Sequence, residues 1–501
     1  MSIINRFRTT LVLSPLVLAG CVTAPGSEQY SSLTSGFSAV SATTKRAIGK
    51  KTVWVQSSEE ARLLSGKVHG LVHKKTLSAD RAVQVALLNN KGLQAAYADI
   101  GMSAAEAWQQ TMLKNPKVSI GILGIGAPEL GAFRAIEGLI ANNILAMLTR
   151  ERRVAIADVR FRQAQLAAAL ETLKLAAETR RAWINVVAAF EQITYLNKAQ
   201  VAADAASAFA EQLGKTGALG KGGQARQHVF YAELTGQRAK AKLAAKLAKE
   251  ELTRLMGLWG SEVDYYVPNA LPRVPGRIKK KRAIESEALH RRVDLQVAKL
   301  ELEAVAKSYG LTEATKTLTD LEIIAGFEAE REVETEYELA GGNLEETKSK
   351  KTVLTPQIEV EFQIPIFDSG EARMRKAELA YMKAANMLAQ KAVNIRSEAR
   401  SAYINYRSTR DIALHYRRNV LPVRTTIEEQ ALLTNNGMIT TTFELLADTR
   451  AKISSLLLSA NAKKDFWLAD SNLSATIYGG GAASGGGGDA PAAVADSGGG
   501  H

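Results

Sequence analysis

The chain of 501 residues is poor in several features that define common protein classes. It has one cysteine, Cys21, so it cannot form an intramolecular disulfide. No run of about 20 apolar residues occurs, which excludes a helix that crosses a bilayer. No proline lies between Pro128 and Pro268, so very long helices can form there. The net charge is +13, but basic residues are interleaved with acidic ones and form no patch, which argues against nucleic-acid binding.

Motifs of catalysis and metal binding are also missing from the sequence. The six histidines have no zinc-ligand spacing with the cysteine, and His69 and His73 lack the glutamate of an H-E-x-x-H motif. Gly124-x-Gly126 lacks a third glycine and a following βα unit, and no Walker loop or nucleophile elbow occurs. We therefore expect no enzyme activity, no metal and no cofactor, so any transport must draw its energy from partner proteins.

The N-terminus has the layout of a secretory signal peptide. Arg6 and Arg8 precede the short apolar segment "LVLSPLVLAG", and residues 1–20 are expected to be removed. The ending Leu18-Ala19-Gly20-Cys21 resembles a bacterial lipobox, in which the cysteine receives diacylglycerol and acyl lipid such as palmitate. An ordinary signal with an incidental cysteine is the alternative. Residues 21–76 are then a lipidated tether and equatorial segment, with 22–45 extended.

Two stretches of the sequence resemble each other at an offset of 220 residues. "ETRRAWINVVAAF" begins at Glu178, and "EARSAYINYRSTR" begins at Glu398. Trp183 is matched by Tyr403, and we interpret both as core residues. A second match aligns "LLNNKGLQAA" at 87–96 with "ALHRRVDLQVA" at 288–298. The chain is therefore internally duplicated, with a first repeat at 77–284 and a second at 285–470.

Apolar spacing predicts long helices in both repeats. The first repeat has helices at about 78–113 and 151–213, then a tip at 214–221 and a helix to about 257. The second has a helix from about 370 that Pro422 should interrupt, a tip at 435–440 and a helix to about 470. Such lengths require lengthwise packing against other helices. The Gly-rich tail at 471–501 is expected to be disordered.

Strands are predicted at 116–126 and as a hairpin at 320–367, whereas 134–153 looks helical. Between Phe327 and Leu339 residues that are apolar or neutral, except Arg331, alternate with glutamates, and a similar alternation follows at 358–366. This pattern favours a transmembrane barrel with a carboxylate-lined pore, and a soluble hairpin with one wet face is the alternative. The predicted pore-lining residues are Glu328, Glu330, Glu332, Glu334, Glu336, Glu338, Glu359 and Glu361.

The lipobox, the duplication, the long helices and the inserted hairpin together resemble the TolC-like outer-membrane efflux proteins. The motifs "PIFDSGEARMRKAELA" at 365–380 and "NNGMITTTFELLADTR" at 435–450 carry the closest likeness. The resemblance implies a mainly α fold with inserted β: long antiparallel helices form a trimeric α-barrel tunnel, and each chain gives four strands to a shared twelve-stranded β-barrel. Residues 134–153 depart from the family, because they lack its strand alternation and its re-entry motif.

The resemblance also implies sites and partners. A periplasmic gate would lie at Glu444 and Asp448, and a periplasmic adaptor would dock at the two tips. The docking residues would be Gly217, Leu219, Gly437 and Ile439. The expected function is a passive, lipid-anchored channel in the outer membrane of a Gram-negative bacterium, joined to the adaptor and an inner-membrane transporter. The alternative is a helical periplasmic lipoprotein without a pore, which the degraded first hairpin favours.

Overall fold

The computed structural model describes residues 27–126, 133–217, 220–278, 283–340, 343–436 and 442–479. Cys21, Leu219, Gly437 and Ile439 lie outside the described residues. The chain forms two compact units. The first combines residues up to 36 with 101–163 and 300–386, and the second combines 37–100, 164–299 and the chain from 387 onward.

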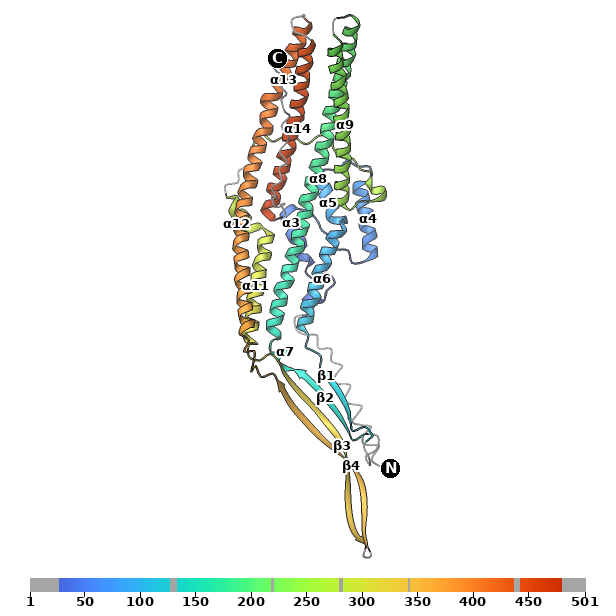
Figure 1. Ribbon diagram of the computed structural model, residues 1–501, viewed down its shortest axis with the longest axis vertical. Helices are drawn as coiled ribbons and strands as arrows, with labels where there is room; N and C mark the ends of the chain where they lie inside the picture. Colours follow the sequence, from blue (N-terminus) through green and yellow to red (C-terminus); the bar gives the residue numbers. More distant parts are fainter. Residues whose placement is uncertain are drawn as a thin grey trace. The chain divides into compact units, whose positions relative to one another are not determined.

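Helices and strands follow one another along the chain as labelled in Figure 1. The helices are α2 (Glu28–Ser31), α3 (Phe37–Ile48), α4 (Ser58–Val72), α5 (Ala79–Asn89), α6 (Lys91–Thr111), α7 (Ile144–Leu148), α8 (Arg150–Lys215), α9 (Lys221–Met256), α10 (Ile284–Arg291), α11 (Val293–Ala314), α12 (Glu371–His415), α13 (Leu421–Asn436) and α14 (Thr442–Tyr478). The strands are β1 (Lys117–Leu123), β2 (Ala135–Asn143), β3 (Leu321–Ala340) and β4 (Asn343–Phe362). A 3₁₀ turn occupies Gly260–Val263, and a π-helical turn occupies Tyr416–Val420.

The interruption predicted at Pro422 is present. The π-helical turn separates α12 from α13, and Pro422 is the second residue of α13. Because proline has no N–H and its ring crowds the preceding turn, the α-helical ladder cannot pass through it unchanged. The wider π turn absorbs this disruption, so the two helices continue one after the other.

The internal duplication takes the form of two helix corners. A single residue separates α5 from α6, and a single residue separates α10 from α11. Asn90 occupies the first corner with φ −66° and ψ 121°, and Arg292 occupies the second with φ −67° and ψ 121°. These corners lie in the segments that match in the sequence, so the structure confirms that the two repeats share one plan.

Each corner lies against the end of the last helix of its repeat. α9 ends at Gly257 and α14 ends beside Gly479, and both glycines have positive φ, 67° and 96°. A Cβ on Gly257 would lie 2.9 Å from the carbonyl oxygen of Asn89, and one on Gly479 would lie 2.9 Å from a carboxylate oxygen of Asp294. Both positions therefore need glycine for the backbone conformation and for the close approach.

Two apolar clusters in the second unit correspond to the two repeats. The first is built around Trp183, whose indole Nε1 donates a hydrogen bond to the carbonyl of Leu77 over 2.8 Å. The second is built around Tyr406 and Phe466, whose ring centroids are 5.6 Å apart. Tyr403 is half-buried against the second cluster, so Trp183 and Tyr403 both contribute to packing, as predicted.

The structure corrects three expectations about element boundaries. The described part of the predicted extended segment 22–45 is largely helical, because aromatic contacts hold it: Tyr30 packs edge-on against Phe161 at 5.4 Å, and Phe37 packs against Tyr97 at 4.9 Å. The predicted disordered tail instead begins as the last turns of α14 up to Tyr478, where Leu473 and Ile477 are buried. Residues 135–143, expected to be helical, form strand β2.

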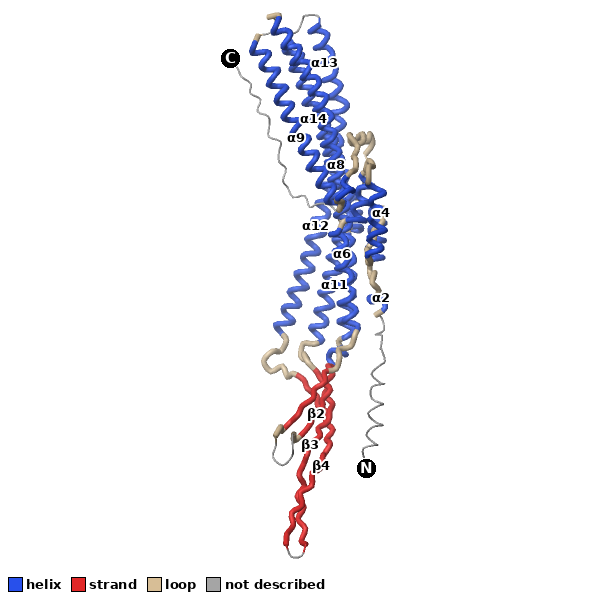
Figure 2. Tube along the Cα trace, turned by 90° about the vertical axis from the view of Figure 1, so that its right-hand side faces the viewer, coloured by secondary structure: helices blue, strands red, loops and turns tan. Residues whose placement is uncertain are grey.

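The four strands form one antiparallel sheet in the order β1-β2-β3-β4, and all of them belong to the first unit. β1 pairs with β2 from Lys117↔Ala141 to Leu123↔Ala135, so the first hairpin is short but present. β2 pairs with β3, which places the first hairpin beside the second (Figure 2). The helix-like composition of "AIEGLIANN" is overridden by this pairing, since β propensity depends on neighbouring strands.

Candidate functional site

One face of the sheet carries a continuous band of apolar side chains, which we call the belt. Cross-strand partners and alternate residues share a face, so the register assigns every member of the belt to the same side. The belt consists of Val118, Ile120 and Ile122 on β1, Ile136 and Ile140 on β2, Leu321, Ile323, Ala325, Phe327 and Ala329 on β3, and Leu354, Pro356, Ile358, Val360 and Phe362 on β4. Ile120 and Ile358 are 75% and 79% exposed, so the described chain leaves much of this face uncovered.

The belt has the dimensions of a membrane-spanning strand. On β3 it runs from Leu321 to Ala329, and the opposite stretch of β4 runs from Phe362 to Leu354. A tilted strand of about 9–11 residues crosses the hydrocarbon core of a bilayer. The belt is therefore long enough for that purpose, and its residue types suit a hydrocarbon environment.

The opposite face carries carboxylates. Of the predicted pore-lining residues, Glu328, Glu359 and Glu361 lie on this face within the length of the belt, and Glu330 lies on it one residue beyond Ala329. The structure adds Glu137 and Glu322, which the sequence analysis missed. Glu137 belongs to the strand that was expected to be helical, and Glu322 precedes the stretch in which alternation was recognised.

Three of these carboxylates have partners in other segments of the sheet. Arg134 forms an ion pair of 2.6 Å with Glu330, and Lys117 forms one of 2.9 Å with Glu322. Glu137 accepts a hydrogen bond of 2.9 Å from the side-chain amide of Gln357. These contacts join the residue before β2 to β3, β1 to β3 and β2 to β4 across the polar face. They therefore support the register of the strands and also pair part of the negative charge.

The remaining predicted pore residues continue along the same strand. Glu332, Glu334 and Glu336 lie on the carboxylate face beyond the last apolar pair, Ala329↔Leu354. Glu338 lies in β3, but its side chain is outside the described set. Gln363 and the residues after it are past the end of β4 at Phe362. The carboxylate face is thus longer than the belt.

The helical ends hold the predicted gate and part of the predicted docking site. Glu444 is exposed in the first turn of α14, and Asp448 is half-buried one turn later. Gly217 follows the end of α8 with φ 76°, which a turn into α9 requires. Arg238 on α9 donates a hydrogen bond of 2.6 Å to Asn197 on α8, so these helices pack as an antiparallel pair below that turn.

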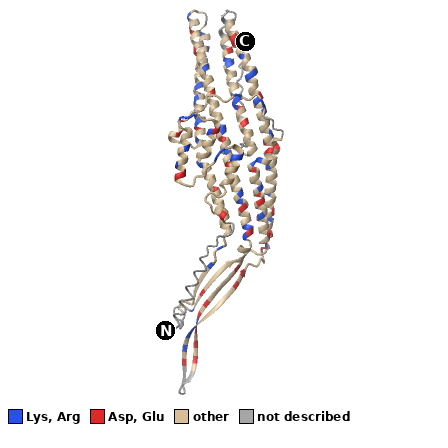
Figure 3. Ribbon diagram, turned by 180° about the vertical axis from the view of Figure 1, so that it is seen from behind, with Lys and Arg blue, Asp and Glu red and all other residues tan. Residues whose placement is uncertain are grey.

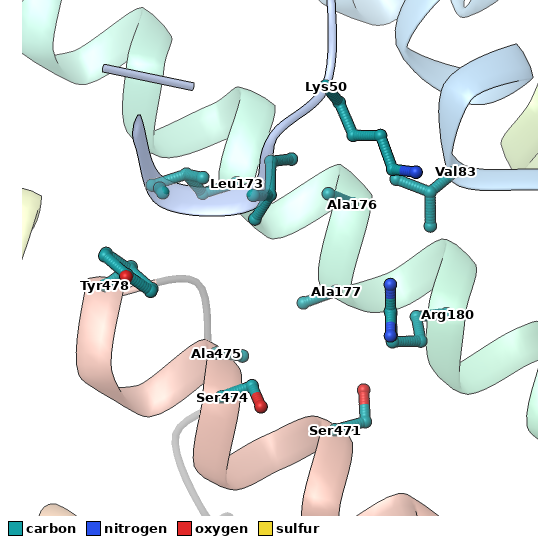
Figure 4. A pocket seen from close by; sticks show the side chains of 12 residues that line it. Lys50, Val83, Leu173, Ala176, Ala177, Arg180, Ser471, Ser474, Ala475 and Tyr478 are labelled. Carbon is teal, nitrogen blue, oxygen red and sulfur yellow. The ribbon is translucent and has the colours of Figure 1, made fainter. Parts of the chain in front are cut away.

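The second unit contains a cavity of about 200 Å³ (Figure 4). Its walls are mainly apolar, from Ile48, Val83, Leu173 and Ala177, and Ser471 adds a buried hydroxyl that has no hydrogen-bond partner among the described residues.

Two cations border this cavity, and both contact Asp80 in the first turn of α5. Lys50 Nζ is 3.4 Å and Arg180 Nη2 is 2.6 Å from the same carboxylate oxygen. In the second repeat, Arg400 pairs with Glu285 in the first turn of α10 over 3.2 Å. Because the arginine–carboxylate pair recurs in both repeats, we interpret it as an ion pair that stabilises the packing of two helices.

Two further properties concern the part of the chain that the structure describes. None of its helices combines the length and apolarity needed to cross a bilayer. It brings no three His, Cys, Asp or Glu side chains together in a group that could hold a metal ion.

Comparisons with solved structures decide the fold. The structure matches the Campylobacter jejuni CmeC outer membrane channel with a TM-score of 0.64 and 17% identity, over 80% of this chain and 86% of that one. It matches the open state of the Neisseria gonorrhoeae MtrE outer membrane channel with a TM-score of 0.60 and 14% identity, over 80% and 89%. The chain has the fold of the TolC-like outer-membrane channels.

Other members of this channel fold give the same result, and sequence comparison alone does not reach it. The Vibrio cholerae outer membrane protein VceC matches with a TM-score of 0.61 and 16% identity, over 80% of this chain and 96% of that one. No protein-family model matches the sequence, and no curated protein does. The likeness to the channel fold therefore lies in the arrangement of helices and strands.

Proposed function

We propose that the chain is an outer-membrane efflux channel, a passive conduit that three copies build together. The sheet is the observation that carries this proposal: one face is an exposed apolar belt and the other bears carboxylates. β1 and β4 are the end strands of the described sheet. If β4 of one copy pairs with β1 of the next, three sheets close into a barrel in which every backbone group is satisfied. The belt then faces lipid and the carboxylates face the pore.

Exposed apolar side chains on the helices support association of copies. Ile184 is 4% exposed, whereas Ile404, its counterpart 220 residues later, is 63% exposed. Val393 and Ile412 on the same helix, α12, are 65% and 50% exposed. A second copy that packs along α12 would bury these side chains, which is the contact that a helical tunnel requires.

The anchor and the partners are parts of the same proposal. Acylation of Cys21 would attach the mature chain to the outer membrane, because more than one acyl chain gives stable anchoring. A periplasmic adaptor and an inner-membrane transporter would supply the energy. Cys21→Ser should abolish labelling by a fatty-acid analogue in cells, and mass spectrometry that finds Cys21 unmodified in the mature protein would rule the anchor out.

Planar-bilayer recording tests the channel directly. The purified protein should give stable single-channel conductance, and Ile358→Lys should prevent insertion, since a lysine facing the bilayer midplane costs about 2–4 kcal/mol in each copy. Thr355→Lys is the matched control, because Thr355 lies on the carboxylate face opposite Glu328. A protein that forms trimers but never conducts would instead fit the helical spacer. The sequence favoured the helical spacer because the first hairpin looked degraded. Since β1 and β2 do pair as a hairpin, that reason no longer applies.

A further inference from the structure

The second hairpin continues well past the described ends of β1 and β2. The pairing of β2 with β3 ends at Ala135↔Glu330, whereas β3 and β4 remain paired from Arg331↔Thr352 to Ala340↔Asn343. We call this two-stranded part the ribbon (Figures 1 and 2). It begins two residues beyond the last apolar pair of the belt, and at about 3.3 Å per residue it is roughly 30 Å long.

The register sorts the charges of the ribbon onto two faces. The described side chains on the belt side include three cations, Arg331, Lys348 and Lys350, and one carboxylate, Glu346. The described side chains on the other side include three carboxylates, Glu332, Glu334 and Glu336, and one cation, Lys351. Both signs are visible on this hairpin in Figure 3. The ribbon therefore has a basic face that continues the belt and an acidic face that continues the carboxylate face.

The basic side chains begin at the depth of the lipid headgroups if the belt spans the hydrocarbon core, with Arg331 in that layer and Lys350 and Lys348 farther out along the strand. On a strand tilted by about 45°, Arg331 and Lys350 lie roughly 5 and 10 Å beyond the last apolar pair along the membrane normal. The headgroup region extends roughly 5–8 Å beyond the hydrocarbon on each side. Long basic side chains bend to reach such a layer while their stems follow the strand.

Local contacts suit this position. The Arg331 guanidinium lies 4.1 Å from the centroid of the Phe133 ring, and aromatic rings are frequent at the membrane–water interface. Lys348 Nζ is 3.6 Å from Glu346, and both side chains are about half exposed. Surface contacts of this kind leave the positive potential of the face available to an anion.

We propose that the basic face of the ribbon binds the phosphate groups of anionic lipid in the leaflet that the hairpin enters. This proposal rests on the proposed function, which places the belt in a membrane. Arginine matches phosphate with two parallel hydrogen bonds, and lysine contributes a point charge. The acidic face is turned away from lipid and toward the pore. The ribbon therefore presents positive charge to the lipid and negative charge to the pore.

Lys350 and Lys351 give a matched pair of variants, because they are adjacent in sequence and lie on opposite faces. Lipid A, which carries two phosphates, is titrated into the detergent-solubilised full chain, and bound lipid is counted by native mass spectrometry. Lys350→Gln should weaken binding about fivefold, since each basic residue near an anionic surface contributes about that factor. Arg331→Gln with Lys348→Gln and Lys350→Gln should weaken it roughly a hundredfold, and Lys351→Gln should leave it unchanged.

Other results would overturn the proposal. If Lys350→Gln and Lys351→Gln weaken lipid A binding equally, binding depends on the net charge of the ribbon and not on which face carries it. Unchanged binding by the triple variant would exclude the basic face as the site. If inorganic phosphate competes as well as lipid A does, the ligand is free phosphate and the lipid assignment is wrong.

Conductance in neutral phosphatidylcholine bilayers separates this proposal from the channel proposal. The triple variant should conduct like the unchanged protein there, which would also show that its barrel is intact. Loss of lipid A binding together with normal conductance supports the lipid site. If no variant conducts, the channel proposal fails, and the comparison between Lys350→Gln and Lys351→Gln still decides whether the basic face binds lipid.

Discussion

Asn90 and Arg292 occupy equivalent corners of the two repeats with the same backbone conformation, yet their side chains act differently. Asn90 donates a hydrogen bond of 3.0 Å to the carbonyl of Leu255 near the end of α9. Arg292 is buried and contacts two carboxylates, Asp294 at 2.9 Å and Glu398. The shared corner is thus fixed by a neutral hydrogen bond in one repeat and by an ion-pair cluster in the other.

The two corners should differ in their sensitivity to substitution. Asn90→Ala removes hydrogen bonds to neutral groups and should destabilise the fold by about 1 kcal/mol. Arg292→Met leaves two carboxylates without their main partner and should cost about 3–5 kcal/mol. Denaturant unfolding of the detergent-solubilised variants measures both values. Adding Asp294→Asn and Glu398→Gln to Arg292→Met should restore part of the loss, and equal costs at the two corners would contradict the interpretation.

Alkaline pH should destabilise the second unit through two tyrosines. Burial raises the pKa of Tyr97 and of Tyr265 to about 12 in each case. A tyrosine in the unfolded chain ionises near pH 10, so this stability is complete below pH 10 and is lost as the pH rises toward 12. Ionisation of each tyrosine in the unfolded chain should lower the free energy of unfolding by about 2–3 kcal/mol over this pH range. The fall in stability should be smaller in Tyr97→Phe, while the same change at exposed Tyr381 should leave it unaltered.

The carboxylate face predicts a preference for cations. Glu328 and Glu359 would line the pore in every copy, and carboxylates clustered in a narrow passage concentrate cations. Replacing both by glutamine should lower the cation-to-anion permeability ratio severalfold in reversal-potential measurements. Glu346→Gln is the control, because Glu346 lies on the opposite face of β4. An anion preference in the unchanged protein would count against this arrangement.

Glu444 and Asp448 are predicted to gate the periplasmic end. Like charges gathered near a three-fold axis repel each other or bind divalent cations. Glu444→Ala should therefore raise the conductance and weaken block by divalent cations. Glu211, an exposed residue near the end of α8, provides a control variant, Glu211→Ala. If conductance and block both stay the same in Glu444→Ala, Glu444 is a solvated helix-surface residue.

The tips are predicted to be the docking site of the adaptor. Gly217 follows α8, and the sequence has an apolar residue, Leu219 or Ile439, in each predicted tip. Leu219→Asp with Ile439→Asp should leave a folded and correctly localised trimer that no longer crosslinks to its adaptor or supports efflux. Leu219→Met with Ile439→Met should keep both activities. Normal efflux by the aspartate variant would exclude the tips.

The sequence by itself determined the long helices, the duplication and the second hairpin. Each depends on a pattern that is visible in the sequence itself: three- and four-residue apolar spacing, repeated segments, and period-2 alternation of glutamate with apolar residues. The break before Pro422 belongs to the same group, because the missing N–H acts on its own helix. These features could be predicted from the sequence without knowledge of tertiary contacts.

Only the tertiary structure decided the features that depend on distant partners. Strand β2 exists because Ala135–Asn143 pairs with β1 on one side and with β3 on the other, although its own composition favours a helix. Helix α3 is held by the contact of Phe37 with Tyr97, sixty residues away. The opposite faces of Lys350 and Lys351 follow from the register of β3 with β4. In each case the stabilising contacts join segments that are far apart in the chain. Local sequence patterns do not encode such contacts.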